Sequence, residues 1–103
     1  KFDSRDLIVA LRATPIIVAA NKLGVVNHIL LALEALPKIL RAEAKVVLVS
    51  PQKMDAATAS NAKLLAQFFP PGKISPLPWL GKKFDATAAL KKPVVRPMLQ
   101  KLF

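Results

Sequence analysis

The strongest constraint on the fold of this chain is a set of three short, largely apolar runs, of which the first two are apolar at nearly every position. They cover residues 15–20, 46–50 and 73–77, and each has the length of a β-strand. Runs without alternation between polar and apolar residues are typical of strands that are buried on both faces of a parallel sheet. The third run contains Pro76, which favours a place at the edge of that sheet.

Segments with helical patterns precede and separate these runs. The apolar spacing predicts a first helix over residues 3–13, and Asp3 or Ser4 can cap its first turn. A second helix is predicted from Val25, where apolar residues recur at helical spacing. Pro37 should end or kink this helix, because proline lacks an N–H group and clashes with the preceding turn.

A third helix is predicted over residues 59–69, with Asp55 or Thr58 as its cap. The order helix, strand, helix, strand, helix, strand contains a βαβαβ unit, whose strands should be parallel and whose crossovers should be right-handed. The predicted fold class is therefore α/β, with a parallel sheet between helices in three layers. At 103 residues, the chain is expected to be one α/β domain or a fragment of one.

Composition excludes several classes of protein. Apolar residues make up 53% of the sequence, which is too high for a disordered chain. The chain has no cysteine and a single histidine, His28, so disulfides, thiolate metal sites and triad chemistry have no residues to form them. No apolar run reaches the ~20 residues of a membrane span, and no signal-peptide pattern is present, so we expect a cytoplasmic protein.

The formal net charge is +10, and the excess is concentrated near the C-terminus. Residues 82–103 form a predicted basic tail whose only acidic residue is Asp85. Its basic residues are Lys82, Lys83, Lys91, Lys92, Arg96 and Lys101. Such a tail is either a contact for nucleic acid or another polyanion, or a solvated face that keeps the domain soluble.

The segment 21–28 connects the first predicted strand to the second predicted helix. Ligands of such sheets bind beyond the carboxyl ends of the strands, and the first turn of a helix offers free N–H groups and a positive dipole end to an anion. Gly24 permits a positive φ, and the Asn27 side chain can donate a hydrogen bond. The alternative is an ordinary turn. His28 is either an acid or base, or a packed or surface histidine.

Two other segments follow predicted strands. They are residues 50–55 and 77–81, which should lie at the same rim of the sheet as residues 21–27. Trp79 could cover a nucleotide base or the hydrophobic core there.

Two stretches of the sequence resemble motifs of the dethiobiotin synthetase family. Residues 14–18 read Thr-Pro-Ile-Ile-Val, and residues 22–31 read Lys-Leu-Gly-Val-Val-Asn-His-Ile-Leu-Leu, similar to a Lys-Leu-Gly-x-x-Asn-His segment of that family. Residues 77–80 read Leu-Pro-Trp-Leu, similar to the end of its nucleotide loop. The resemblance implies the C-terminal half of a fold like that of P-loop NTPases, in enzymes that use ATP, magnesium and carbon dioxide to close a ring on 7,8-diaminononanoate.

The resemblance also implies roles for individual residues. Those for a substrate carboxylate are Lys22, Gly24, Val25 and Asn27, and those for the nucleotide are Ser50, Leu77, Pro78 and Trp79. The partner would be a second copy in a homodimer or a complementary N-terminal half. The phosphate-binding Gly-x-x-x-x-x-Gly-Lys-Thr loop and the acidic magnesium ligands belong to that other half, so we expect no catalytic or metal-binding residue here and no catalysis by the chain alone.

The alternative from another class is a small basic interaction domain that binds nucleic acid or another polyanion through its tail. Charge is the evidence for it, because the aromatic and glycine patterns of common RNA-binding modules are missing. In the predicted fold, Phe68, Phe69 and Phe84 are core positions.

Overall fold

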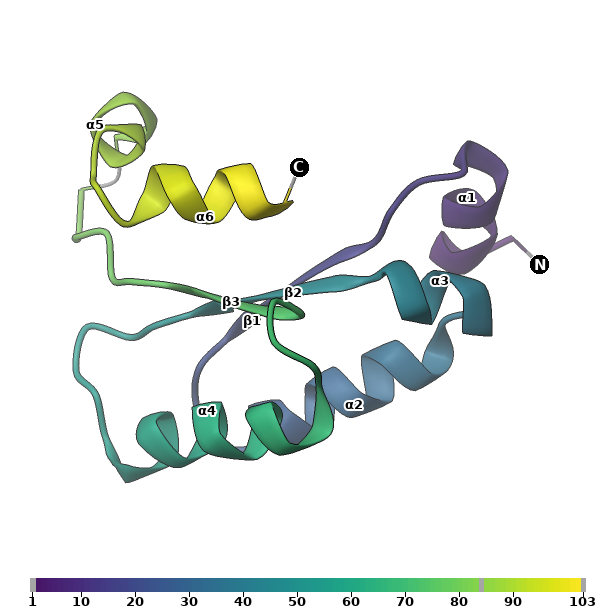
Figure 1. The fold of residues 1–103 in the computed structure, drawn as a ribbon, viewed down its shortest axis with the longest axis horizontal. Coiled ribbons are helices and arrows are strands. Elements are labelled where there is room, and N and C mark those ends of the chain that lie inside the picture. Colours follow the sequence, from purple (N-terminus) through teal and green to yellow (C-terminus); the bar gives the residue numbers. More distant parts are fainter. Residues whose placement is uncertain (1, 84, 103) are drawn as a thin grey trace.

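The computed structural model describes residues 2–83 and 85–102, and within them it has a mixed α/β fold with a small parallel sheet (Figure 1). The elements in chain order are α1 (Ser4–Leu11), β1 (Ile16–Ala20), α2 (Val25–Ala35), α3 (Lys38–Glu43), β2 (Lys45–Val49), α4 (Ala56–Phe68), β3 (Ile74–Leu77), α5 (Ala86–Leu90) and α6 (Val95–Leu102).

The sheet has the order β1-β2-β3, and both neighbouring pairs are parallel. In the register, Val47 lies opposite Val18 on one side and Ser75 on the other. The prediction of three parallel strands is confirmed, and so is the place of β3 at an edge. The central strand is the best buried, as expected of a strand with four consecutive apolar residues after Lys45.

Helices cover the two faces of the sheet unequally. Figure 1 shows α2 and α4 along one face and α6 across the other. The main core lies on the first face, and its buried residues are Val25, Ile29, Leu33, Leu36, Leu40, Ala44, Val46, Leu48 and Leu65. A smaller cluster on the second face joins Val47 to Met98 and Leu102 of α6. The part of β1 beside that cluster is open, and Val18 is 67% exposed.

The helix predicted from Val25 ends before Pro37, as predicted, and a separate short helix follows it. α2 ends at Ala35, Leu36 is extended, and Pro37 is the N-cap of α3. Proline disfavours helical backbone in the residue before it, which explains the break at Leu36. The guanidinium of Arg41 then donates hydrogen bonds to the carbonyls of Leu33, Glu34 and Leu36 and so caps the end of α2.

The predicted basic tail is largely helical. It contains α5 and α6, and α6 buries Val95, Met98 and Leu102. Pro97 lies in the first turn of α6, where proline is tolerated because the N–H groups of that turn have no partner within the helix. The Lys45 ammonium donates to the carbonyl of Lys101 at 2.9 Å, which ties the last turn of α6 to the start of β2.

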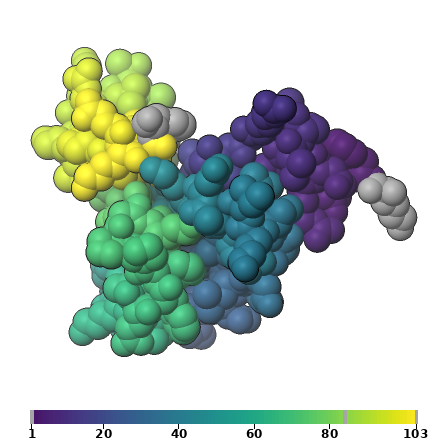
Figure 2. Space-filling model, turned by 45° about the vertical axis from the view of Figure 1, so that its right-hand side comes forward, coloured from purple at the N-terminus to yellow at the C-terminus, as the bar shows by residue number. Residues whose placement is uncertain are grey.

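The predicted caps agree with the structure. Asp3 caps α1 in a reciprocal pair with Asp6, and Asp55 caps α4 in a reciprocal pair with Thr58. α1 has no buried residue and projects from one end of the molecule (Figure 2).

The prediction of three core phenylalanines holds in part. Phe69 packs against the main core. Phe68 is 57% exposed, because it lies on the outer side of α4, and the prediction for it is wrong. Phe84 lies outside the described residues.

No helix within residues 2–83 and 85–102 is long and apolar enough to cross a membrane.

Candidate functional site

The turn between β1 and α2 lies at the carboxyl end of β1. Gly24 adopts a φ of 86°, in the left-handed region, and is the N-cap of α2. A Cβ atom at this position would meet no heavy atom within 4 Å, so the space in front of Gly24 is open. Glycine is favoured here because it adopts a positive φ without strain. A residue with a side chain would be destabilising through backbone strain rather than through a steric clash.

Most of the amides in this turn are unengaged. The Val25 N–H donates to the carbonyl of Lys22 at 3.1 Å, and the His28 N–H donates to that of Gly24 at 3.2 Å. Within residues 2–83 and 85–102, the N–H groups of Gly24, Val26 and Asn27 have no hydrogen-bond acceptor. Three backbone donors therefore remain available at the positive end of the α2 dipole.

The residues predicted to anchor a carboxylate differ in their environments. Lys22, Gly24 and Asn27 are exposed, as is His28. The side chain of Val25 is buried in the main core, and its amide is already bonded, so Val25 holds the start of α2 rather than presenting a free donor.

A buried pair of asparagines fixes the turn from beneath. The Asn61 side-chain amide of α4 donates to the side-chain oxygen of Asn21 at 2.9 Å and to the carbonyl of Lys22 at 2.8 Å. The Asn21 amide in turn donates to the carbonyl of Thr58 at 3.2 Å. Asn61 was not predicted as a site residue; the available signal was an amide four residues before Leu65, on the same face of the helix, where a buried polar group needs a partner.

The turn is bordered by a hollow of about 320 Å³ that runs along β1 and α2. Lys22 and His28 contribute the polar side chains of its lining, and Val18 and Ala32 are among the apolar ones. The segment from Ile16 to Leu33 contains no acidic residue, so the local electrostatic environment favours an anion.

The residues predicted to bind a nucleotide follow β2 and β3 on the same rim. The Ser50 N–H donates to the Leu77 carbonyl at 2.8 Å, and the Asn21 N–H donates to the Val49 carbonyl at 2.8 Å, so the three carboxyl-end segments are neighbours as predicted. Ser50, Leu77 and Pro78 are partly buried, whereas Trp79 is 43% exposed. The indole is thus accessible for stacking.

In the part of the chain that the structure describes, no three His, Asp or Glu side chains gather where they could hold a metal ion.

All six basic residues of the predicted tail are exposed. The Asp85 carboxylate accepts hydrogen bonds from the amides of Thr87 and Ala88 and so caps α5.

Comparisons with known proteins give no relative: no protein-family model, curated protein or solved structure matches this chain.

Proposed function

We propose that this domain anchors the terminal carboxylate of a small substrate at the β1–α2 turn, as the C-terminal half of an enzyme like dethiobiotin synthetase would. The observation that carries the proposal is the open turn at Gly24. It combines a left-handed glycine, three unengaged amides and a helix N-terminus at the carboxyl rim of a parallel sheet.

Each residue of the turn has a definite task in this proposal. The amides of Gly24, Val26 and Asn27 donate to the carboxylate, and the Asn27 side chain adds a donor from the first turn of α2. Lys22 supplies positive charge from the other side of Gly24. The Asn21–Asn61 pair keeps the turn in its binding conformation. The turn is therefore ordered before the ligand arrives, and binding does not lose conformational entropy in ordering it.

ATP and magnesium, which the resemblance implies, do not fit the residues of this chain by themselves. The sequence contains no phosphate-binding loop, and the described carboxylates do not gather into a magnesium site. Ser50, Leu77, Pro78 and Trp79 could contact an adenine ring, but no reaction step follows from them. The phosphates and the metal would have to be held by another half or another chain.

The proposal is tested by calorimetric titration of the chain with 7,8-diaminononanoate. Asn27→Ala should weaken binding by roughly two- to tenfold, because a hydrogen bond contributes about 0.5–1.5 kcal/mol. Gln67→Ala, which removes an exposed amide side chain from α4, is the matched control and should leave binding unchanged. Equal affinities for all three proteins would contradict the anchor.

A second candidate function is weak binding of a polyanion by the folded tail. The observation that favours it is that Lys82, Lys83, Lys91, Lys92, Arg96 and Lys101 are all exposed. Salt dependence separates this candidate from the first, because contacts with several phosphates weaken steeply as the salt concentration rises.

A further inference from the structure

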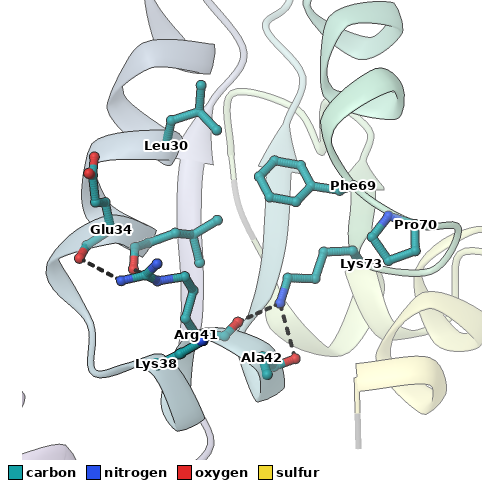
Figure 3. Close-up of a pocket in the computed structure, with 9 residues that line it drawn as sticks. Leu30, Glu34, Lys38, Arg41, Ala42, Phe69, Pro70 and Lys73 are labelled. Atoms are coloured by element: carbon teal, nitrogen blue, oxygen red, sulfur yellow. Dashed lines mark hydrogen bonds between the residues drawn. The ribbon is translucent and has the colours of Figure 1, made fainter.

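A groove of about 720 Å³ lies at the opposite end of α2 from the Gly24 turn. It is formed by the last turns of α2, by α3, and by the loop from α4 to β3 (Figure 3). From Gly24 to Glu34 the helix advances about 15 Å, so the groove is separate from the turn. Its volume lies within the range of roughly 300–1,000 Å³ that is typical of small-molecule sites.

The groove has apolar walls. Leu30 of α2 lies across the groove from the ring of Phe69, and Pro70 continues the wall beside Phe69 (Figure 3). Leu33 of α2 also lines the groove. Leu33 and Phe69 belong to the packing of the main core, so these walls are held in place by the fold. An apolar body of modest size could be removed from water between them.

The charged groups of the groove are unbalanced. Lys38, Arg41 and Lys73 line it, and Glu34 is the acidic residue among its lining residues. Lys73 donates to the carbonyls of Arg41 and Ala42, at 2.8 and 3.3 Å (Figure 3). Within the described residues, neither Arg41 nor Lys73 forms an ion pair with a carboxylate. Their positive charges therefore have only neutral carbonyl partners.

Unused donors remain on these cations. Arg41 donates through Nε and one terminal nitrogen, which leaves its second terminal nitrogen without an acceptor among the described residues. Lys73 has one more N–H than the two it uses, and Lys38 donates to no described group. Partial burial lowers the pKa of the Lys73 ammonium, and a bound anion would oppose that shift.

We propose that this groove binds a small amphipathic carboxylate, with its apolar body between Leu30 and Phe69 and its carboxylate among Lys38, Arg41 and Lys73. Because three basic side chains and one acidic side chain line the groove, it favours an anionic ligand over a cationic one. The apolar walls select a chain or ring over a free inorganic ion.

The test is a titration of the complete chain with decanoate, followed by ¹H–¹⁵N NMR. The amides of Leu33, Ala42 and Lys73 should shift together and saturate, at about millimolar ligand for a molecule of this size. Decyltrimethylammonium, with the same tail and the opposite charge, should produce no such saturable shift. The Gly24 and Asn27 amides report on the other site, so the two proposals can fail independently.

Variants test the role of charge without disturbing the fold. Lys38 is exposed and makes no described hydrogen bond, so Lys38→Glu should fold normally and weaken decanoate binding by about threefold to tenfold. Lys63→Glu makes the same change on the exposed side of α4, outside the groove, and should not alter the affinity. Equal weakening in both variants, shifts confined to α5 and α6, or saturable binding of the cationic amphiphile would overturn the proposal.

Discussion

The side-chain amide of Asn61 on α4 donates a 2.9 Å hydrogen bond to the side-chain oxygen of Asn21, the residue that follows β1. Both side chains are buried, and the same Asn61 amide also holds the carbonyl of Lys22. A residue in the middle of one helix therefore fixes the loop that leads into another. The proposed anion turn depends on this contact for its shape.

Removing one member of this pair should destabilise the domain. Asn61→Ala leaves the buried side-chain oxygen of Asn21 without a donor and removes one of the two donors to the Lys22 carbonyl, which should cost about 1–3 kcal/mol in the free energy of unfolding. Urea denaturation measures the loss. Asn21→Ala and the double variant complete a cycle in which the two losses should not be additive. Strict additivity would mean that the two side chains act independently.

Gly24→Ala should cost roughly 1–2 kcal/mol of stability, because a φ of 86° is unfavourable for a residue with a Cβ atom. No clash adds to this cost, since the space in front of Gly24 is open. Gly24→Asn should cost less, as asparagine tolerates the left-handed region better than alanine. Thermal unfolding of the three proteins should rank them Gly, Asn, Ala, and a reversed order for Asn and Ala would contradict the backbone argument.

Two adjacent leucines of α4 test the position of the core. Leu65 is 1% exposed, and Leu65→Ala should cost about 2–5 kcal/mol by removing buried side-chain atoms and leaving a cavity. Leu64 is 42% exposed, and the same change there should cost less than about 1 kcal/mol. Similar losses at both positions, measured by denaturant unfolding, would mean that α4 packs on a different face.

Asp3 should make the first helix sensitive to acid. Its hydrogen bond with the Arg5 side chain, followed by bonds from the amides of Asp6 and Arg5, lowers the pKa of the Asp3 carboxyl from 3.8 to about 2. A lowered pKa in the folded state means that the contribution of Asp3 to stability is complete above the unfolded pKa and is lost as the pH falls toward 2.

NMR titration of the Asp3 carboxyl carbon checks this prediction. Arg5→Ala should raise the pKa of Asp3 back toward 3.8, because it removes the largest cause of the shift. Arg96→Ala, a similar loss of an exposed arginine on α6, should leave the pKa unchanged. A shift of equal size in both variants would point to net charge rather than to the local hydrogen bond.

The folded tail should bind single-stranded nucleic acid weakly and without sequence preference. The logarithm of the affinity should fall with the logarithm of the salt concentration, at a slope of about 0.7 per phosphate contacted. Fluorescence anisotropy with labelled oligothymidylate measures the slope. Replacing Lys91 and Lys92 with Gln should reduce it, whereas the same change at Lys53 and Lys63, which are also exposed, should not. Tight binding that persists at high salt would favour the interaction-domain alternative.

The three parallel strands could be predicted from the sequence. A short run such as Ile16–Ala20, which is apolar at every position, is typical of a strand in a parallel sheet. The sequence also predicted Asp55 as a helix cap, since that signal is local. Residues 82–103 were interpreted as a basic tail from their charge alone, and α6 within them was not predicted. The position of α6 depends on the burial of Met98 and Leu102 against Val47 of β2, a contact between residues far apart in the sequence.

The candidate site was only partly predictable, because some of its contacts join residues that are far apart in the sequence. Gly24 and Asn27 stand in one short segment, so their proximity follows from the chain itself. Asn61 is 40 residues from Asn21, and nothing local in the sequence pairs them. The groove at Phe69 and Lys73 likewise requires α3 to fold back beside the α4–β3 loop, which no periodicity of the sequence specifies.

The most direct test of the proposed anchor is an NMR titration of the chain with 7,8-diaminononanoate and, in parallel, with its methyl ester. The ester keeps the amines and the carbon chain and removes the negative charge. The acid should shift the amide resonances of Gly24, Val26 and Asn27 in a saturable way, and the ester should not. The amide resonances of α6 should remain unchanged with either ligand. Unmoved turn amides at millimolar acid, or equal shifts with the ester, would contradict the claim that this turn binds a carboxylate.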